Sequence, residues 1–305
     1  MYASPQADFG YDISDYENVY PPYGTLDDMN KLIKGLHSRG MKLILDLVIN
    51  HTSDEHKWFT ESASSRTNPK ADWYIWRDGK KDSNGELQPP NNWGSIFGGS
   101  AWEYVPARDQ FYLHLFAKGQ PDLNWESDIA RQAIYDSALH FWFKKGVDGF
   151  RIDTANLYSK DQSFPDGPAG GKFGKYGDSE GLTLNGPRIH EFYHEMREQI
   201  FSKYVGGDPM LVGELPGTGW EETLRFVSSD NKEMSMVFDF GLPGLGGTFT
   251  HAKHDVEKVT LSGLKHALKL PQDLSSNTKA WGTVFGENHD IARMFASIIA
   301  SICRY

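Results

Sequence analysis

Apolar residues along this chain alternate between helical and extended spacing. Thr25 can cap a helix that ends at Gly40, with Asp28 at the capping-box position. The apolar face of this helix comprises Met29, Leu32, Ile33 and Leu36. An apolar run over residues 41–49 follows at once and predicts a strand. A helix followed by a strand is thus the first unit of the predicted fold.

The same unit recurs along the rest of the chain. The helix and strand ranges are 127–145 with 147–152, 187–204 with 210–213, 220–227 with 234–240, and 261–270 with 280–285. These strands are short and mostly apolar, as expected of a parallel sheet that helices cover. The predicted fold class is therefore α/β.

Two segments interrupt this order. Residues 51–124 are dense in aromatic and turn residues and end in an alternating run, which predicts a small inserted domain rather than a plain loop. Tryptophans in such a segment belong to the core more often than to ligand platforms. Residues 159–181 are rich in glycine but lack the GxxxxGK[ST] spacing of a phosphate loop, so they predict a mobile surface loop.

Three carboxylates follow predicted strands: Asp153, Glu214 and Asp290. In a βα-barrel, catalytic residues come from the carboxyl ends of several different strands. Any one of these acids could instead cap a helix or join an ion pair. The three together favour a catalytic site.

Neighbouring residues predict different protonation states for two of these acids. Arg151 and Asp153 alternate on one strand and project to the same side, so the arginine should lower the pKa of Asp153, as suits a nucleophile. Apolar neighbours should raise the pKa of Glu214, as suits a general acid. Asp290 and the adjacent His289 are suited to sugar hydroxyls. Paired carboxyl groups in these two states are what glycoside cleavage needs.

Other chemistries find less support in the sequence. His51 and His56 could suggest a metal, but their spacing is not HExxH and no cysteine is near, so no zinc site is expected. Neither a GxSxG elbow nor a GxGxxG motif is present. The net charge of -10 argues against nucleic acid, and no apolar stretch approaches the roughly 20 residues of a membrane span. A single cysteine, Cys303, and the absence of a signal-like start predict a cytoplasmic protein.

Several motifs resemble those of the α-glucosidases, the maltases and oligo-1,6-glucosidases of the α-amylase family (glycoside hydrolase family 13). They are Asp46-Leu-Val-Ile-Asn50-His51, Gly149-Phe-Arg-Ile-Asp153, Gly213-Glu214-Leu215 and Glu287-Asn-His-Asp290. A further motif, Gln120-Pro-Asp-Leu-Asn124, resembles the maltase and oligo-1,6-glucosidase branch rather than starch-degrading amylases. The resemblance therefore implies short substrates.

The resemblance also implies roles for individual residues. Asp153 would be the nucleophile, Glu214 the acid and base, and Asp290 the stabiliser of the transition state. Arg151 would fix the nucleophile. The remaining residues would bind the glucose unit: Asp8, Tyr11, His51, Thr154, His289 and Arg293.

The implied activity is that of a retaining, exo-acting α-glucosidase that releases glucose from the non-reducing end of maltose and short α-1,4-glucosides. Thr154 favours α-1,4 links, because α-1,6-specific relatives tend to carry valine at this position. Retention predicts that the carboxyl groups of Asp153 and Glu214 lie about 5 to 5.5 Å apart. The alternatives are an oligo-1,6-glucosidase or isomaltase, a sucrose-cleaving relative, and a catalytically inactive fragment.

For the fold, the resemblance implies a (β/α)8 TIM barrel that is incomplete at both ends, with an inserted domain B after the third strand. The expected division is barrel at 1–51, domain B at 52–124, barrel at 125–290 and a divergent tail at 291–305. The expected partners are maltose and short malto-oligosaccharides, without nucleic acid or membrane. No cofactor or metal is expected, because the structural calcium site of relatives lies near a first strand that this chain lacks.

Overall fold

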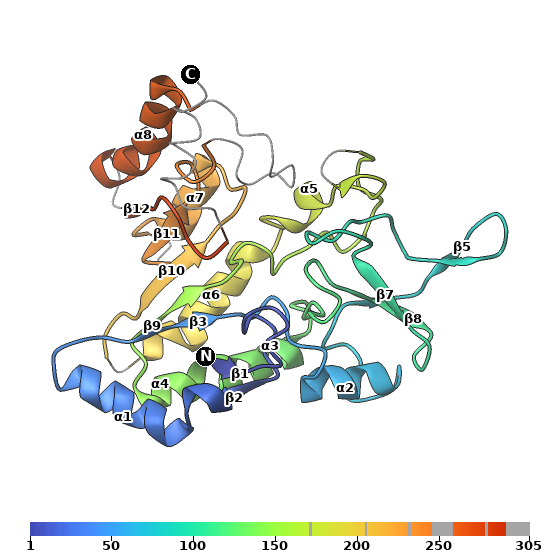
Figure 1. Ribbon diagram of the computed structural model, residues 1–305, viewed down its shortest axis with the longest axis horizontal. Helices are drawn as coiled ribbons and strands as arrows, with labels where there is room; N and C mark the ends of the chain where they lie inside the picture. The colour runs from blue at the N-terminus through green and yellow to red at the C-terminus, as the bar shows by residue number, and fades with distance from the viewer. Residues whose placement is uncertain (171–172, 205, 231–232, 246–258, 278–279, 291–305) are drawn as a thin grey trace. The chain divides into compact units, whose positions relative to one another are not determined.

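The computed structural model describes residues 1–170, 173–204, 206–230, 233–245, 259–277 and 280–290. They belong to two compact units, Met1–Met210 (unit 1) and Leu211–Tyr305 (unit 2). Each unit contains parallel strands and helices that precede them in the chain (Figure 1). The predicted α/β class is therefore confirmed.

Unit 1 begins with an antiparallel pair that the sequence did not predict, β1 (Tyr2–Ala3) with β2 (Asp15–Val19). A short 3-10 turn at Pro21–Tyr23 leads to helix α1 (Leu26–His37). The predicted capping box is present, because the Asp28 backbone amide donates to the Thr25 hydroxyl oxygen and the Thr25 backbone amide donates to the Asp28 carboxylate.

Strand β3 (Ile44–Leu47) follows α1 and pairs in parallel with β9 (Gly149–Ile152), as Figure 1 shows. The strand begins later than predicted, since the Met41 amide still donates to the Leu36 carbonyl at 3.0 Å and closes the end of α1. The register between the strands places Asp46 opposite Arg151. These two side chains therefore share one face of the sheet.

The helix predicted at 127–145 is continuous but not uniform. It comprises α3 (Asp128–Ile134), a π-helical turn at Tyr135–His140 and α4 (Phe141–Lys145). Gly146 ends it in the left-handed conformation with φ 101°. Trp142 is fully buried, and its Nε1 donates to the Tyr16 carbonyl at 2.8 Å. The next predicted helix is α6 (Ile189–Gln199), followed by a 3-10 turn at Phe201–Lys203.

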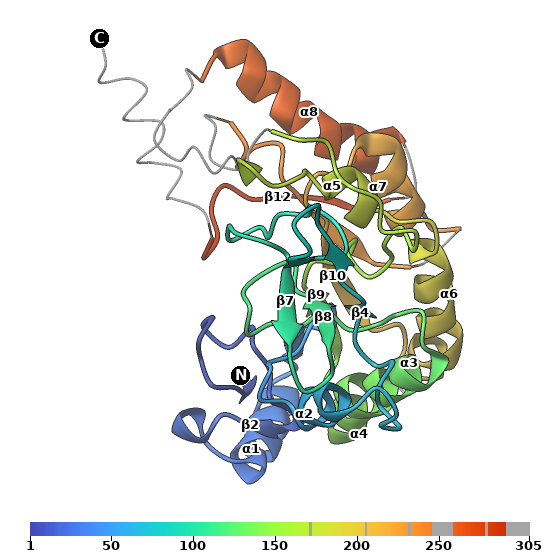
Figure 2. The same cartoon turned by 90° about the vertical axis from the view of Figure 1, so that its right-hand side faces the viewer.

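Residues 52–124 form a region with its own sheet. Helix α2 (Lys57–Ser64) precedes an antiparallel sheet with the order β4-β8-β7, and Figure 2 shows these strands together. The strands of the region are β4 (Trp76–Arg77), β5 (Lys80–Lys81), β6 (Leu87–Gln88), β7 (Trp102–Val105) and β8 (Gln110–Leu113), with β5 and β6 paired as a hairpin. The boundaries proposed for an inserted domain stay a prediction.

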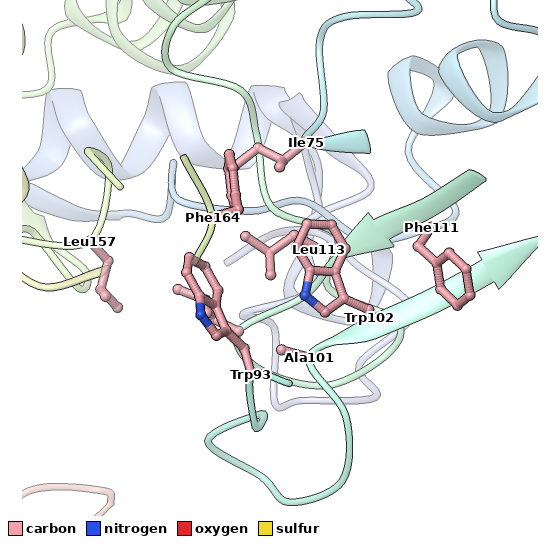
Figure 3. Close-up of a cluster of buried hydrophobic side chains, with 9 residues drawn as sticks. Ile75, Trp93, Ala101, Trp102, Phe111, Leu113, Leu157 and Phe164 are labelled. Carbon is pink, nitrogen blue, oxygen red and sulfur yellow. The ribbon is translucent and has the colours of Figure 1, made fainter. Parts of the chain in front are cut away.

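Aromatic side chains fill the core of this region. Trp93 and Trp102 lie beside Phe164, with ring centroids 5.4 and 5.9 Å from it, and Ile75 and Leu113 belong to the same buried cluster (Figure 3). The prediction that the tryptophans serve the core is confirmed for Trp93 and Trp102, because both are buried.

The glycine-rich segment 159–181 is not a detached surface loop. It contains α5 (Glu180–Thr183), and Phe164 is buried in the core of the 52–124 region. Asn92 exchanges two hydrogen bonds with Gly167, at 3.0 and 2.8 Å, and its carbonyl accepts from Gly177 at 2.7 Å. A Cβ at Gly167 would lie 2.2 Å from the Asp178 carbonyl oxygen, so one glycine of the segment permits close backbone packing.

In unit 2, β11 (Met236–Asp239) pairs in parallel with β10 (Met210–Glu214) and with β12 (Gly282–Val284). Helix α7 (Trp220–Val227) precedes β11 and confirms the predicted range. Helix α8 (Leu261–Asn277) continues through Pro271, beyond the predicted end at Leu270. Proline disfavours a helix interior, which is why the sequence pattern ended there.

Asp148 precedes β9 and accepts from three donors, which lie at the end of α1 and in the loop between α1 and β3. Its carboxylate is 2.8 Å from His37 Nε2, 2.8 Å from Lys42 Nζ and 2.9 Å from the Leu43 amide. Burial would raise the pKa of Asp148, but these hydrogen bonds together outweigh burial and lower the pKa. The folded protein therefore stabilises the charged form of Asp148 relative to the protonated form.

Asp148→Asn is expected to lower the free energy of unfolding by about 1–3 kcal/mol at neutral pH. Because the pKa is lowered on folding, this stabilisation is present above the unfolded-state pKa and is lost as the pH falls through the folded-state pKa. Thermal unfolding at neutral and acid pH should show the difference from wild type shrinking in acid. Asp208→Asn, which removes an exposed partner of Arg197, is the control. An equal loss in both variants, or a loss independent of pH, would contradict the expectation.

Candidate active site

Arg151 holds two carboxylates at the carboxyl ends of β3 and β9. Its Nη1 donates to Asp153 Oδ1 at 2.6 Å and to Asp46 Oδ1 at 2.7 Å. The predicted pairing of Arg151 with Asp153 is therefore present. Asp46 was quoted only as part of a motif, and the parallel register is what brings it to Arg151.

Asp153 is buried, with 8% of its side chain exposed. Its amide donates to the Leu47 carbonyl at 3.0 Å, which fixes the end of β9 beside β3. Burial is the largest influence on the Asp153 carboxyl and raises its pKa, while Arg151 and His51 lower the pKa and Asp46 raises it; the net direction is upward. The expectation that Arg151 would leave the pKa lowered was therefore wrong, since it neglected burial and the second carboxylate.

Thr154 directly follows this acid in a conformation that β-branched residues rarely adopt, with φ 41°. Its hydroxyl donates to Asp153 Oδ2 at 3.3 Å, and its carbonyl accepts from the Leu157 amide at 3.0 Å. Such backbone strain costs on the order of 1–3 kcal/mol and persists only where the surroundings enforce it. Thr154 thus contacts Asp153 Oδ2, while Asp153 Oδ1 accepts from Arg151.

Tyr11 connects this carboxylate pair to a histidine. Its hydroxyl is 3.4 Å from both Arg151 Nη1 and Asp46 Oδ2, and its ring centroid lies 5.7 Å from the guanidinium carbon. The Tyr11 carbonyl is 3.1 Å from His51 Nε2. Tyr11 therefore contacts both groups of polar residues at this end of the sheet.

Asp8 and His51 are connected through Gln120, which was not expected as a site residue. Gln120 Nε2 donates to Asp8 Oδ2 at 2.8 Å and lies 3.2 Å from His51 Nε2. Gln120 Oε1 accepts from the Ala117 amide at 3.0 Å, which fixes the orientation of the side-chain amide. Phe116 packs against His51, with the two ring centroids 5.1 Å apart. The structure thus brings Asp8, Tyr11, His51, Arg151, Asp153 and Thr154 together in unit 1.

Unit 2 carries the remaining expected residues. Glu214 is the last residue of β10 and is buried, with 8% of its surface exposed. Asp290 and His289 lie in the segment after β12 and contact each other, with Asp290 Oδ2 3.3 Å from His289 Nε2. Both of these side chains are at least half exposed. Arg293 lies outside the described residues.

The residues that sequence reasoning missed are Asp46, Asn50, Phe116, Gln120, Asp122 and Lys160. Most of them stand within or beside the quoted motifs, so motif membership was the available signal. Lys160 stands in the glycine-rich segment, where nothing in the sequence marked it as buried.

In the described part of the chain, no group of three or more His, Cys, Asp or Glu side chains is arranged to hold a metal ion. No described helix is both long and apolar enough to cross a membrane.

Comparison with known proteins supplies the class. Residues 1–304 match the family model described as alpha amylase, catalytic domain. An α-glucosidase of Candida albicans is 54% identical over 293 residues, which are 96% of this chain and 50% of that protein. An oligo-1,6-glucosidase of Saccharomyces cerevisiae is 45% identical over 296 residues, covering 96% of this chain and 51% of that protein.

A solved structure agrees with these relatives. The trehalose-6-phosphate hydrolase of Bacillus licheniformis superposes with a TM-score of 0.86 at 42% identity, over 97% of this chain and 51% of that chain. The chain belongs to the α-amylase family, and the predicted TIM-barrel fold class is confirmed. It spans about half the length of the relatives that it matches.

Proposed function

We propose that the protein containing this chain is a retaining, exo-acting α-glucosidase that releases glucose from maltose and short α-1,4-glucosides. The observation that carries the proposal is the buried Asp153 carboxylate, bound by Arg151 and connected through Tyr11 to His51. Such a site offers a carboxylate for covalent catalysis beside polar groups that can bind hydroxyls. The 54% identity to an α-glucosidase supports the same choice.

In the proposed reaction, Asp153 attacks the anomeric carbon of the terminal glucose unit while Glu214 gives its proton to the departing glycosidic oxygen. The resulting glucosyl ester on Asp153 is then attacked by water, from which Glu214 removes a proton. Two inversions leave the product in the α configuration. Asp290 would stabilise the positive charge that develops on the sugar ring. Retention requires the two reacting carboxyl groups to lie about 5 to 5.5 Å apart.

The residues proposed to bind the terminal glucose are Asp8, Tyr11, His51, His289 and Arg293. The Asp8 carboxylate and the His51 ring, joined by Gln120, are suited to the hydroxyls of a terminal glucose. Binding a chain end in this way makes the action exo. The proposal also places the protein in the cytoplasm, with small sugars as its partners.

A preference for α-1,4 links is expected to depend on Thr154. The purified protein should release glucose from maltose faster than from isomaltose, and Thr154→Val should shift the ratio of kcat/KM values toward isomaltose. Valine keeps the β-branch at φ 41° but removes the hydroxyl that donates to Asp153. Steady-state glucose release from both disaccharides and from an aryl α-glucoside measures this effect.

Each alternative has its own outcome in that assay. Faster hydrolysis of isomaltose would identify an oligo-1,6-glucosidase, the function of the 45% identical relative. Cleavage of sucrose but not maltose would identify a sucrose-cleaving enzyme. No glucose release from any substrate by a folded protein would support the inactive alternative and reject the proposed function.

A further inference from the structure

Lys160 is a fully buried cation next to the proposed glucose pocket. Its side chain and that of Asp122 are both 0% exposed, and Nζ lies 3.0 Å from Asp122 Oδ2. The same Nζ donates to the Leu157 carbonyl at 2.7 Å and to Asn50 Oδ1 at 3.1 Å. These three acceptors account for all three ammonium hydrogens. They offset the cost of burying the charge. None of the catalytic steps uses this lysine.

The contacts of Lys160 fix the orientation of the Asn50 side-chain amide. With Oδ1 toward Lys160, the Asn50 Nδ2 points to Asp122 Oδ2 at 3.4 Å and to His51 Nδ1 at 3.2 Å. The flipped amide would place an NH2 group against the ammonium and an oxygen against the carboxylate. Because both contacts would become repulsive, the observed orientation is strongly favoured.

The orientation of Asn50 in turn selects a tautomer of His51. An Asn50 Nδ2 donor requires a lone pair on His51 Nδ1, which leaves the ring proton on Nε2. That proton can donate to the Tyr11 carbonyl, 3.1 Å away. Only the Gln120 Nε2 contact, at 3.2 Å, would prefer the other tautomer. Two of the three contacts therefore favour the proton on Nε2.

We propose that Lys160 is a positioning residue of the pocket, which acts through Asn50 to hold His51 in the tautomer that presents an N–H from Nε2. The part that concerns sugar binding rests on the proposed function. The tautomer itself does not, since it follows from contacts in the protein alone. In this tautomer the one ring N–H of His51 lies on Nε2, where the Tyr11 carbonyl and a substrate oxygen can share it as acceptors.

The test is nitrogen NMR of the whole protein with 15N-labelled histidine, in which long-range correlations distinguish a protonated ring nitrogen from one with a lone pair. The His51 signals among those of the 11 histidines are assigned by their loss in His51→Gln. Wild type should show a protonated Nε2 and an unprotonated Nδ1. The reverse pattern in wild type would overturn the inference without any variant of Lys160.

Variants separate the lysine from general stability. Lys160→Met should let Asn50 flip and make both His51 tautomers visible, and Asn50→Leu should do the same. Lys160→Gln can still donate to Asn50 and should restore the wild-type pattern. Lys118→Met, which removes an exposed partner of Glu103, should change nothing. A folded Lys160→Met protein with the wild-type His51 pattern would reject the role of Lys160.

Kinetics then test the functional part. In Lys160→Met, kcat/KM for maltose should fall by about five- to tenfold, the loss expected for one weakened hydrogen bond to substrate, and Lys160→Gln should recover most of it. If the tautomer changes but the wild-type protein releases no glucose, the proposed function fails and the positioning of His51 stands. If glucose release is normal and the tautomer is unaffected by Lys160, only the positioning role fails.

Discussion

Asp153→Asn is expected to reduce kcat/KM for maltose by roughly 10⁴-fold or more, the scale seen when a catalytic nucleophile is removed. Asparagine has nearly the same shape but cannot form the glucosyl ester. Arg151 would keep its bond to Asp46, at 2.7 Å, so the fold around the site should survive. The assay is steady-state glucose release, together with circular dichroism to confirm that the variant is folded.

A matched control is Asp128→Asn, because 87% of the Asp128 side chain is exposed at the start of α3. It should retain activity close to wild type. A fluorinated glucosyl donor that slows hydrolysis of the ester should label wild type at Asp153, as mass spectrometry of peptides can show. Label on another acid, or substantial activity in Asp153→Asn, would exclude Asp153 as the nucleophile.

Glu214→Gln should produce the second largest loss, about 10²–10⁴-fold for maltose, whose leaving group needs a proton. The loss should be much smaller for the first step with an aryl α-glucoside, because a nitrophenolate can depart without protonation. Stopped-flow measurement of nitrophenol release and steady-state rates with both substrates separates the two steps. An equal loss for both substrates would contradict a role in protonating the leaving group.

Azide adds a second readout for Glu214. A small anionic nucleophile does not need a general base, so it should restore turnover in Glu214→Gln and give α-glucosyl azide, the configuration expected from two inversions. Glu221→Gln is the control, since Glu221 lies on the exposed face at the start of α7. Formation of the β-azide would argue against a glucosyl-enzyme intermediate.

Patterns in the sequence predicted the parallel strands β3, β9, β10, β11 and β12 well, because each of them is a short apolar run that follows a helix. Boundaries moved where a helix end took residues from the predicted strand, as at Met41, whose amide closes α1 rather than starting β3. Helix α8 extends past Pro271, where the low helix propensity of proline predicted an end.

The site was predicted less completely than the fold. Motifs located Asp153 and Arg151. The second contact of Arg151, with Asp46, depends on the register between β3 and β9, which no local pattern encodes. The direction of the Asp153 pKa depends on burial, which the sequence does not give for one residue. The burial of Lys160 could not be predicted either, because a lysine in a glycine-rich segment is ordinarily exposed.

Arg151 donates to both Asp46 and Asp153, and this sharing affects the two steps proposed for Asp153, formation and breakdown of the glucosyl ester. In the proposed reaction, Asp153 first bonds to carbon and later leaves it, and these steps make opposite demands. A carboxylate with a guanidinium to itself would depart easily but attack weakly, whereas an unpaired one would attack well and depart slowly. Because Arg151 also binds Asp46, it neutralises Asp153 less than an arginine with one partner would. In the proposed reaction, the shared arginine would keep the covalent ester from being either hard to form or slow to break down.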